Sequence, residues 1–262
     1  MTTFGFRRFG ALTAGMLAVA SMLGQTLGAQ AQDGGFSGDQ KKAIEKIVKD
    51  YLVANPEVML EVQKILEAKM EKQEAEKLKT ALAENAKDLY RRADAPVAGN
   101  KDGDITVTEF FDYNCGFCKK SFSEVSKLIG QDSKVRFVFK EFPILSKGSE
   151  EASRVALAAR KQGKYWEVHS ALLESKSQAN EATALKIAEK LGLDMAALKV
   201  DMDSPDVKAE LASVKELATK MGINGTPHFL VGDKSIAGAP QDLLPQLSTQ
   251  IGELRKNGCS YC

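Results

Sequence analysis

The stretch EFFDYNCGFCKKSF, residues 109–122, constrains the fold of this chain more than any other feature. It joins a β-branched and aromatic run, residues 105–112, to a segment whose apolar residues recur at helical spacing. The pattern predicts a strand followed by a helix, with Cys115 at the start of the helix and Cys118 one turn further on. Two cysteines at this spacing serve as zinc ligands, as a structural staple or as a redox couple.

The surroundings favour the redox couple. Structural zinc sites normally have four ligands, and the only other pair, Cys259 and Cys262, lies at the far end of the chain. A staple between Cys115 and Cys118 would close too small a loop to add much stability. The free N–H groups and the dipole at a helix N-terminus favour a thiolate at Cys115. We therefore predict Cys115 as the nucleophile and Cys118 as the resolving thiol, with no metal and no cofactor at the site.

The N-terminus predicts the compartment. Arg7 and Arg8 precede an apolar stretch, residues 11–27, and Ala29-Gln30-Ala31 fits the small-x-small pattern of a secretory cleavage site. A membrane anchor is the alternative, but the stretch is short and rich in Gly and Ala, and no stop-transfer charges follow it. We expect residues 1–31 to be a cleaved signal peptide and the mature chain to be periplasmic, where disulfides persist.

The charge of the mature chain excludes some classes of partner. Removing residues 1–31 takes away two arginines and no acidic residue, so the formal net charge falls from +1 to −1. A chain so near neutrality gives no electrostatic reason to expect nucleic acid or an anionic membrane as a partner. Four cysteines are too few for a disulfide scaffold, so apolar burial must supply the core.

Residues 39–92 contain no glycine and are dominated by Lys, Glu, Gln, Ala and Leu, which predicts helix. Asn55 and Pro56 divide this run into two helices, because Asn can cap a helix and Pro fits its first turn. A helix over residues 56–90 would extend about 50 Å, whereas a compact domain of the size that follows is about 30–35 Å across. We expect residues 32–92 to be an oligomerisation region and linker; a surface helix on its own domain is the alternative. The apolar stripe comprises Ile44, Ile47, Val48, Tyr51, Leu52, Val58, Met59, Val62, Ile65, Leu66 and Met70.

The order of strand and helix patterns over residues 93–256 predicts a mixed α/β domain. A loop over residues 94–104 leads into the first strand, and KVRFVFKEF, residues 134–142, predicts a second. Several helices are expected over residues 149–221, interrupted at Gly163, Gly192 and Pro205. A hairpin over residues 225–239 and a helix over 241–256 complete the domain. This order of elements suits a thioredoxin-like fold that carries a helical insertion.

Two motifs together carry a resemblance to a known family. EFFDYNCGFCKKSF and GINGTPHFLV, residues 222–231, resemble the DsbA-like branch of the thioredoxin superfamily over about residues 96–256. In that family the Thr-Pro bond before the last hairpin is cis and lies against the active-site disulfide, which implies the same for Thr226 and Pro227; an ordinary trans turn is the alternative. We expect both residues, together with Gly116 and Phe117 between the cysteines, to contact substrate.

The resemblance also implies a role for Glu109, six residues before Cys115, which matches the family's buried acid. A buried carboxyl with a raised pKa can pass protons to and from the Cys118 thiol; an edge-strand glutamate facing water is the alternative. Gly116-Phe117 stands where strong bacterial oxidases have Pro-His, which predicts a less oxidising couple. His228 is expected to lie at the edge of the site and His169 to be an ordinary helix-packing residue.

The N-terminal helical region resembles the suppressor-of-copper-sensitivity C proteins, some of which are trimeric disulfide isomerases, and the outer-membrane-associated Com1-type members. This implies an oligomeric thiol-disulfide isomerase or reductase that acts on unfolded or misoxidised envelope proteins, with a membrane redox partner protein. A monomeric DsbA-like oxidase is an alternative within the same class. A copper-binding or copper-sequestering protein is an alternative from another class, because thiolates suit Cu(I).

The tail, residues 257–262, ends the chain with a second CxxC, Cys259 and Cys262. It lies beyond the last predicted helix, so we expect that nothing packs around it and no helix dipole activates it. A flexible tail with an oxidised or idle pair is the expectation. A relay that exchanges disulfides with Cys115 and Cys118 is the alternative.

Overall fold

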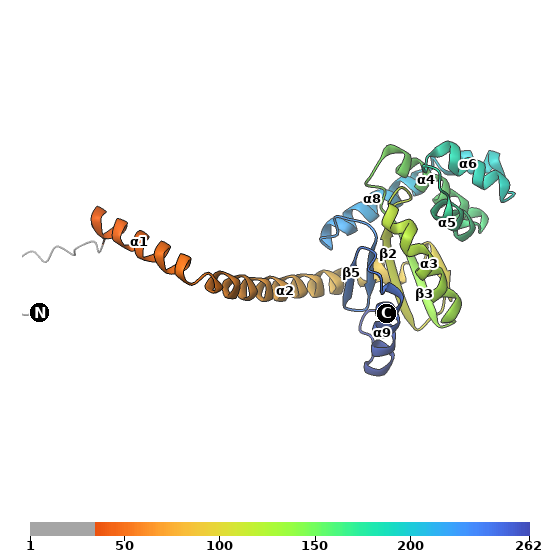
Figure 1. Cartoon of the computed structure of the whole chain (residues 1–262). Coiled ribbons are helices and arrows are strands. Elements are labelled where there is room, and N and C mark those ends of the chain that lie inside the picture. Colours follow the sequence, from red (N-terminus) through yellow and green to blue (C-terminus); the bar gives the residue numbers. More distant parts are fainter. Residues whose placement is uncertain (1–34) are drawn as a thin grey trace, which may run out of the picture. The chain divides into compact units, whose positions relative to one another are not determined.

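The computed structural model describes residues 35–262 (Figure 1). Contacts between residues divide the chain into two compact units, with the boundary between Val62 and Gln63. The predicted signal peptide, residues 1–31, lies outside the described residues. Among the described helices, none is both long enough and apolar enough to span a membrane.

The N-terminal helices form where the sequence predicts them. α1 (Gly38–Ala54) begins at a capping box, in which the Ser37 hydroxyl accepts from the Gln40 N–H and the Gln40 side chain accepts from the Ser37 N–H. Asn55 and Pro56 separate it from α2 (Glu57–Ala86). Twelve of the sixteen large apolar side chains that are exposed in residues 35–262 lie between Phe36 and Met70. These helices therefore present an apolar surface.

The second unit is built on one mixed sheet of five strands in the order β1-β3-β2-β4-β5. β2 (Ile105–Phe111) and β3 (Val135–Glu141) are parallel and are connected by α3 (Gly116–Gln131). β4 (His228–Val231) pairs antiparallel with β2 and forms the predicted hairpin with β5 (Lys234–Ala237). The predicted thioredoxin-like sheet is confirmed.

One strand was not predicted. The sequence indicated a loop over residues 94–104, but β1 (Val97–Gly99) pairs antiparallel with β3, with Val97 opposite Val138. A three-residue strand is too short for an alternating pattern to show in the sequence. It ends at Gly99, whose φ of 74° takes the chain out of the strand.

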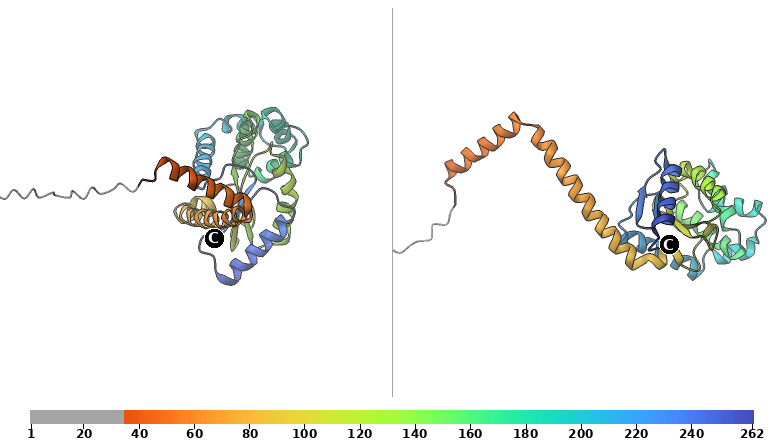
Figure 2. Two further views of the ribbon diagram at one scale, coloured as in Figure 1. Left: turned by 60° about the vertical axis from the view of Figure 1, so that its left-hand side comes forward. Right: turned by 90° about the horizontal axis from the view of Figure 1, so that it is seen from below.

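The helical insertion lies between β3 and β4 and is grouped at one end of the strands (Figures 1 and 2). Gly163 and Gly192 adopt positive φ angles of 69° and 75°, and Pro205 is the first residue of α8, so the predicted interruptions are confirmed. The insertion consists of α4 (Lys147–Ala159), the 3₁₀ helix η2 (Arg160–Gln162), α5 (Tyr165–Glu174), α6 (Glu181–Lys190), α7 (Met195–Asp201) and α8 (Pro205–Lys220). After the hairpin, α9 (Leu243–Asn257) completes the domain.

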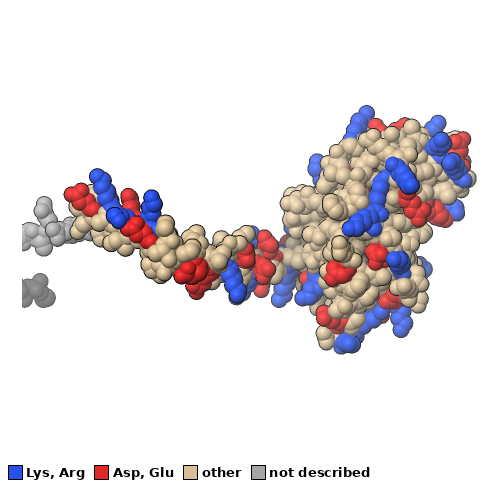
Figure 3. Space-filling view, viewed as in Figure 1, with Lys and Arg blue, Asp and Glu red and all other residues tan. Residues whose placement is uncertain are grey.

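The sheet separates two apolar clusters, because side chains alternate between its faces. Val107 and Phe111 of β2 belong to the cluster on the α3 face, whereas Phe110 belongs to the cluster on the α8 face. Figure 1 shows α3 and α8 on opposite sides of the strands. Basic and acidic side chains are interspersed along the N-terminal helices and over the visible face of the second unit (Figure 3).

The last turns of α2 and the π-helix η1 (Lys87–Arg91) pack on the α/β domain that contains the sheet. Leu82, Leu89 and Tyr90 are fully buried in the cluster on the α8 face. The Tyr90 hydroxyl also donates a hydrogen bond to the carbonyl of Gly232 at 2.7 Å. The domain division between residues 92 and 93 stays a proposal, and the packed core extends back into α2.

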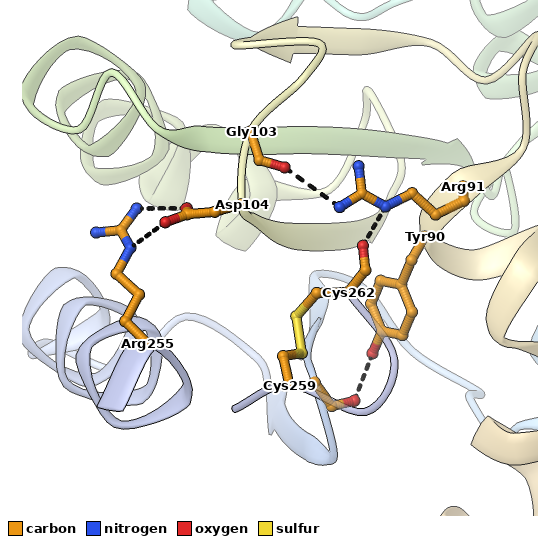
Figure 4. Close-up of a disulfide and its surroundings, with 8 residues drawn as sticks. Tyr90, Arg91, Gly103, Asp104, Arg255, Cys259 and Cys262 are labelled. Carbon is orange, nitrogen blue, oxygen red and sulfur yellow. Dashed lines mark hydrogen bonds and ion pairs between the residues drawn. A yellow bond between two sulfur atoms is a disulfide. The ribbon is translucent and has the colours of Figure 1, made fainter. Parts of the chain in front are cut away.

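The expectation that nothing packs around the tail was wrong. Cys259 and Cys262 form a disulfide, with a Cα–Cα distance of 5.6 Å (Figure 4). Both cysteines pack against the cluster on the α3 face, and Tyr261 packs against the cluster on the α8 face. The sequence alone could not show that the end of α9 would bring the tail back to the domain.

Candidate active site

Cys115 is the N-cap residue of α3, at the end of β2 where the polypeptide leaves the sheet. Its Sγ accepts a hydrogen bond from the Cys118 backbone N–H at 3.4 Å. The Cys115 side chain is only 5% exposed, and Cys118, one turn into the helix, is fully buried. Both cysteines are thiols. The structure therefore brings the two predicted cysteines together at the positive end of a helix dipole.

The loop before Cys115 is held by side chains that the sequence analysis did not single out. Asp112 accepts hydrogen bonds from the backbone N–H groups of Asn114 at 2.7 Å and Leu145 at 2.9 Å. The Asn114 amide donates to the Ala179 carbonyl and accepts from the Ala179 N–H, at 2.9 and 2.8 Å. It also donates to the hydroxyl of Ser149 at 3.0 Å. The helical insertion and the loops beside it thus fix the loop that positions Cys115.

The surroundings lower the pKa of Cys115 to about 6. The largest cause is the hydrogen bond with the Cys118 side chain, and the backbone N–H groups of Phe117 and Cys118 act in the same direction. Burial opposes the shift. A hydrogen bond with Thr226 also lowers the pKa. In the protonated form, the Cys115 thiol donates to the Thr226 carbonyl at 3.2 Å. The net direction favours a thiolate at neutral pH.

Cys118 and Glu109 are both shifted toward their neutral forms. Burial is the main cause of the raised pKa of Cys118, followed by the hydrogen bond with Cys115 and the charge of Glu109. Burial also raises the pKa of Glu109 well above its ordinary value, with a further contribution from the charge of Cys115. Glu109 is 2% exposed and lies on β2, on the face that packs against α3. The inward position predicted for this carboxyl is confirmed.

The Thr226–Pro227 peptide bond is cis, as the resemblance implied. The Thr226 carbonyl lies against Cys115, and the Pro227 carbonyl accepts from the Gly238 N–H at 2.8 Å. His228 follows as the first residue of β4, and its Nε2 lies 2.7 Å from the Ser235 hydroxyl. The structure thus places Thr226, which the sequence predicted to contact substrate, beside the predicted nucleophile Cys115.

Exposed apolar side chains lie next to Cys115 in the chain and in the loop after β3, whose Leu145 N–H donates to Asp112. Gly116 is exposed, and Phe117 is 62% exposed although it lies between two buried cysteines. Ile144 and Leu145, in the loop after β3, are 41% and 54% exposed and were not predicted as site residues. Their signal in the sequence was the apolar pair that follows Pro143. An apolar surface beside a thiolate suits an unfolded polypeptide better than a small polar substrate.

A buried polar cluster lies behind the loop that carries the nucleophile. The Glu141 carboxylate accepts hydrogen bonds from the hydroxyls of Tyr113 and Tyr165, both at 2.8 Å, and of Ser153 at 2.7 Å. Burial raises the pKa of Glu141 to about 8. His169 is fully buried beside Tyr113, at 3.2 Å, and burial lowers the pKa of its imidazole to about 3. The packing role predicted for His169 is confirmed, and the missed acid Glu141 anchors Tyr113 two residues before Cys115.

Comparison with known proteins identifies the family. Residues 106–252 match the model of the DSBA-like thioredoxin domain, which covers more than half of the chain. This chain belongs to the DsbA-like thioredoxin family. Residues 40–73 match a second model, the N-terminal domain of the copper resistance protein ScsC. The family assignment predicted from the sequence is confirmed, and the predicted N-terminal helical segment contains the match to the ScsC model.

Solved structures are similar to this chain over most of their length. A thioredoxin-like oxidoreductase from Silicibacter pomeroyi is 45% identical, covers 66% of this chain and 98% of its own, and superposes with a TM-score of 0.63. A linker-deletion mutant of ScsC from Proteus mirabilis is 26% identical, covers 86% of this chain and 99% of its own, and has a TM-score of 0.65.

Two curated relatives match about half of this chain. Disulfide bond formation protein D of Bacillus subtilis is 28% identical over 155 residues, which are 54% of this chain and 69% of that protein. Na(+)/H(+) antiporter NhaA 3 of Salinispora tropica is 28% identical over 140 residues, which are 53% of this chain and only 22% of the antiporter. The shared part is therefore one module of the longer relatives.

Proposed function

We propose that this chain is a periplasmic protein-disulfide isomerase or reductase that acts through Cys115 and Cys118. The observation that carries the proposal is the Cys115 sulfur, whose pKa is lowered to about 6 at the N-terminus of α3 and which lies 3.2 Å from the Thr226 carbonyl. A thiolate in this position attacks a substrate disulfide and forms a mixed disulfide. Unfolded or misoxidised envelope proteins are the proposed substrates.

Each residue at the two sulfurs is assigned a different step of the disulfide exchange. Cys115 forms the mixed disulfide and one substrate cysteine leaves as a thiolate. The substrate thiolate can then attack another disulfide of the substrate, which is isomerisation, or Cys118 can release the substrate in reduced form. Cys118 must lose its proton to do so, and Glu109 is the buried group beside it that can accept that proton when ionised.

Substrate binding is assigned to the backbone of Thr226 and Pro227 and to the surface around Gly116 and Phe117. The cis bond before β4 leaves the Thr226 carbonyl directed at the nucleophile. An extended polypeptide can pair with such backbone groups as an added strand. A membrane redox partner that restores the dithiol is part of the proposal, because repeated reduction of substrates consumes reducing equivalents.

The N-terminal helices favour an isomerase over a single-domain oxidase. Their exposed apolar side chains include Ile47 at 67%, Leu60 at 68% and Ile65 at 62%. Contact between copies of this surface would remove it from water. Linked catalytic domains raise the effective concentration of a second domain near a bound substrate. A trimer is the proposed assembly, and the number rests on the resemblance of this region to ScsC proteins.

Two full-length variants and one deletion test the assembly. Removing residues 32–70 leaves Leu78 onward, which packs on the domain, and should give a folded monomer that oxidises dithiols normally. Isomerisation of scrambled disulfides should fall sharply. Ile47→Glu with Leu66→Glu should have the same effect at full length, whereas the matched surface change Lys49→Glu with Lys69→Glu should not. A full-length monomer by sedimentation, or a deletion variant that isomerises like the parent, would contradict the assembly.

The proposed export is tested separately. The N-terminus of the protein recovered from the periplasm should be Gln32 if cleavage follows Ala31. Recovery of the chain in the cytoplasm with residues 1–31 intact would contradict the proposal.

Two alternatives to the proposed activity remain measurable: a monomeric oxidase, and a copper-binding protein that uses the two thiolates. Tight stoichiometric Cu(I) binding by the reduced protein, lost on Cys115→Ser, would favour the copper protein.

A further inference from the structure

The tail pair, Cys259 and Cys262, has no part in the function proposed above. The tail follows α9, where Gly258 turns the chain with a φ of 85°. Its two cysteines form a disulfide and are half-buried against the cluster on the α3 face. The bond closes a ring of only four residues, so it adds little stability by restricting the unfolded chain. Its effect must therefore be local.

The disulfide holds two groups against the junction of α2 and η1. Tyr261, inside the ring, packs on the same apolar cluster as Leu78 and Ala81 of α2. Arg91 of η1 donates from Nε to the backbone carbonyl of Cys262 and from Nη2 to the carbonyl of Gly103 at 3.2 Å (Figure 4). Arg91 thus links the tail to the residues that precede β2.

The tail disulfide lies at the opposite end of β2 from the active site. Arg91 contacts Gly103, and Arg255 near the end of α9 pairs with Asp104 at 2.8 Å, both immediately before β2. Cys115 comes after the other end of the strand. Seven extended residues span about 20 Å, which is too far for exchange between the two pairs of one chain. A dithiol that reduces the tail must therefore come from another molecule.

We propose that Cys259–Cys262 is a second redox site: oxidised, it clasps the last turns of α2 and η1 to the catalytic domain, and a dithiol that reduces it releases them. A thiolate of the dithiol attacks one sulfur, and the other tail cysteine leaves as a thiolate. The second thiol of the dithiol then attacks the mixed disulfide. The products are two reduced tail cysteines and the dithiol oxidised to its own disulfide, a transfer of two electrons.

Reduction weakens the contacts of the tail with the domain, because the Cys259–Cys262 bond no longer closes a ring. Residues 259–262 are then no longer closed into a ring and gain conformational freedom. Tyr261 and the Cys262 carbonyl lose the restraint that keeps them against α2 and Arg91. The residues so released belong to the junction between the N-terminal helices and the catalytic domain, so the clasp sets the local stability of that junction without touching Cys115.

Hydrogen exchange in the full-length chain tests the clasp. Cys115→Ser with Cys118→Ser removes the active-site thiols, so any response to dithiothreitol must come from the tail. Reduction should speed exchange of peptides covering residues 78–91 about tenfold, through local opening. Peptides from α5 to α7 should not respond. Adding Cys259→Ser and Cys262→Ser should give the fast exchange with or without dithiothreitol, whereas the matched change Ser260→Ala should keep the response.

Three results would overturn the proposal. The first is unchanged exchange over residues 78–91 when mass spectrometry shows both tail cysteines reduced. The second is a tail disulfide that millimolar dithiothreitol cannot reduce in the folded protein. The third is a purified protein whose tail cysteines are thiols in air. In the otherwise unaltered chain, Cys259→Ser with Cys262→Ser should leave dithiol exchange at Cys115 unchanged, which separates a clasp from a relay.

Discussion

The two CxxC pairs of this chain have the same spacing and opposite surroundings. Cys115 caps a helix, and its pKa is lowered to about 6. Cys259 follows the C-terminus of α9, where backbone carbonyls, not N–H groups, are left over. The first pair is a dithiol beside a cis-proline loop, and the second is a disulfide held by Arg91. The CxxC spacing permits a disulfide in both pairs. Their positions relative to a helix end determine how each disulfide can act.

The partners of the two pairs differ in the same way. Glu109 lies buried where its charge acts on Cys118, and we propose that it exchanges a proton with that thiol. The second pair is surrounded by groups that hold the tail: the guanidinium of Arg91 and the apolar cluster on which Tyr261 packs. A catalytic pair needs a route for protons and room for substrate. A structural pair needs contacts that stabilise the tail when its disulfide is closed.

The largest expected difference between the pairs is in catalysis. Cys115→Ser should lower disulfide exchange on the order of 10³-fold or more, because it removes the nucleophile. Cys259→Ser with Cys262→Ser should leave the rate within about twofold. Initial rates of insulin reduction and of scrambled-protein refolding measure both. Equal losses from the two changes would show that the pairs act in one relay.

Glu109→Gln should slow disulfide exchange at the first pair by less than Cys115→Ser does, and it should not affect the second pair. The amide cannot accept a proton from Cys118, so release of the mixed disulfide should slow by about tenfold to a hundredfold. Attack by Cys115 should change much less. Stopped-flow measurement of the two phases, with trapped mixed disulfide detected by mass spectrometry, separates the steps. An equal slowing of attack and release would assign Glu109 to positioning instead of proton transfer.

The smallest expected difference concerns the residues that hold each pair in place, Asn114 for the first pair and Arg91 for the second. It should appear in the free energy of unfolding. Asn114→Ala removes hydrogen bonds that tie the nucleophile loop to Ser149 and Ala179 and should lower the free energy of unfolding by about 2 kcal/mol. Arg91→Ala removes contacts to the tail and to Gly103 at the surface and should cost about 1 kcal/mol or less. Urea unfolding of both reduced and oxidised forms gives the comparison. A larger loss for Arg91→Ala would make the tail a global structural element.

The placement of Cys115 and Cys118 could be predicted from the sequence because its determinants are close together along the chain. Strand, cysteines and helix lie within residues 105–131, and alternation in the strand placed Glu109 on the buried face. Thr226 and Pro227 could be joined to them only through the family resemblance, since 111 residues separate Thr226 from Cys115. Asp112 and Asn114 were missed because their partners belong to the helical insertion and the loops beside it.

The disulfide of the tail agrees with the expected oxidised pair, but its packing was predicted wrongly because its partners are distant in the sequence. Nothing in NGCSYC indicates that Arg91 will lie beside Cys262, 171 residues earlier in the chain. β1 was missed for the same kind of reason, since three residues carry no period and only pairing with β3 makes them a strand. Glu141 carried a signal that was not used: it alternates with Phe137 and Phe139, which lie on the α3 face of β3.

Thiolate absorbance of the reduced protein against pH tests the central claim most directly. In a chain with Cys259→Ser and Cys262→Ser, absorbance at the thiolate band should rise with a midpoint at about pH 6, because the thiolate of Cys115 is stabilised in the folded protein. The alkylation rate of Cys115 should rise through the same pH and level off above it. Cys118 should remain protonated throughout, because burial raises its pKa. A midpoint near the ordinary cysteine value of about 8.5 would contradict the account, because placement at the helix would then have no effect on the thiol.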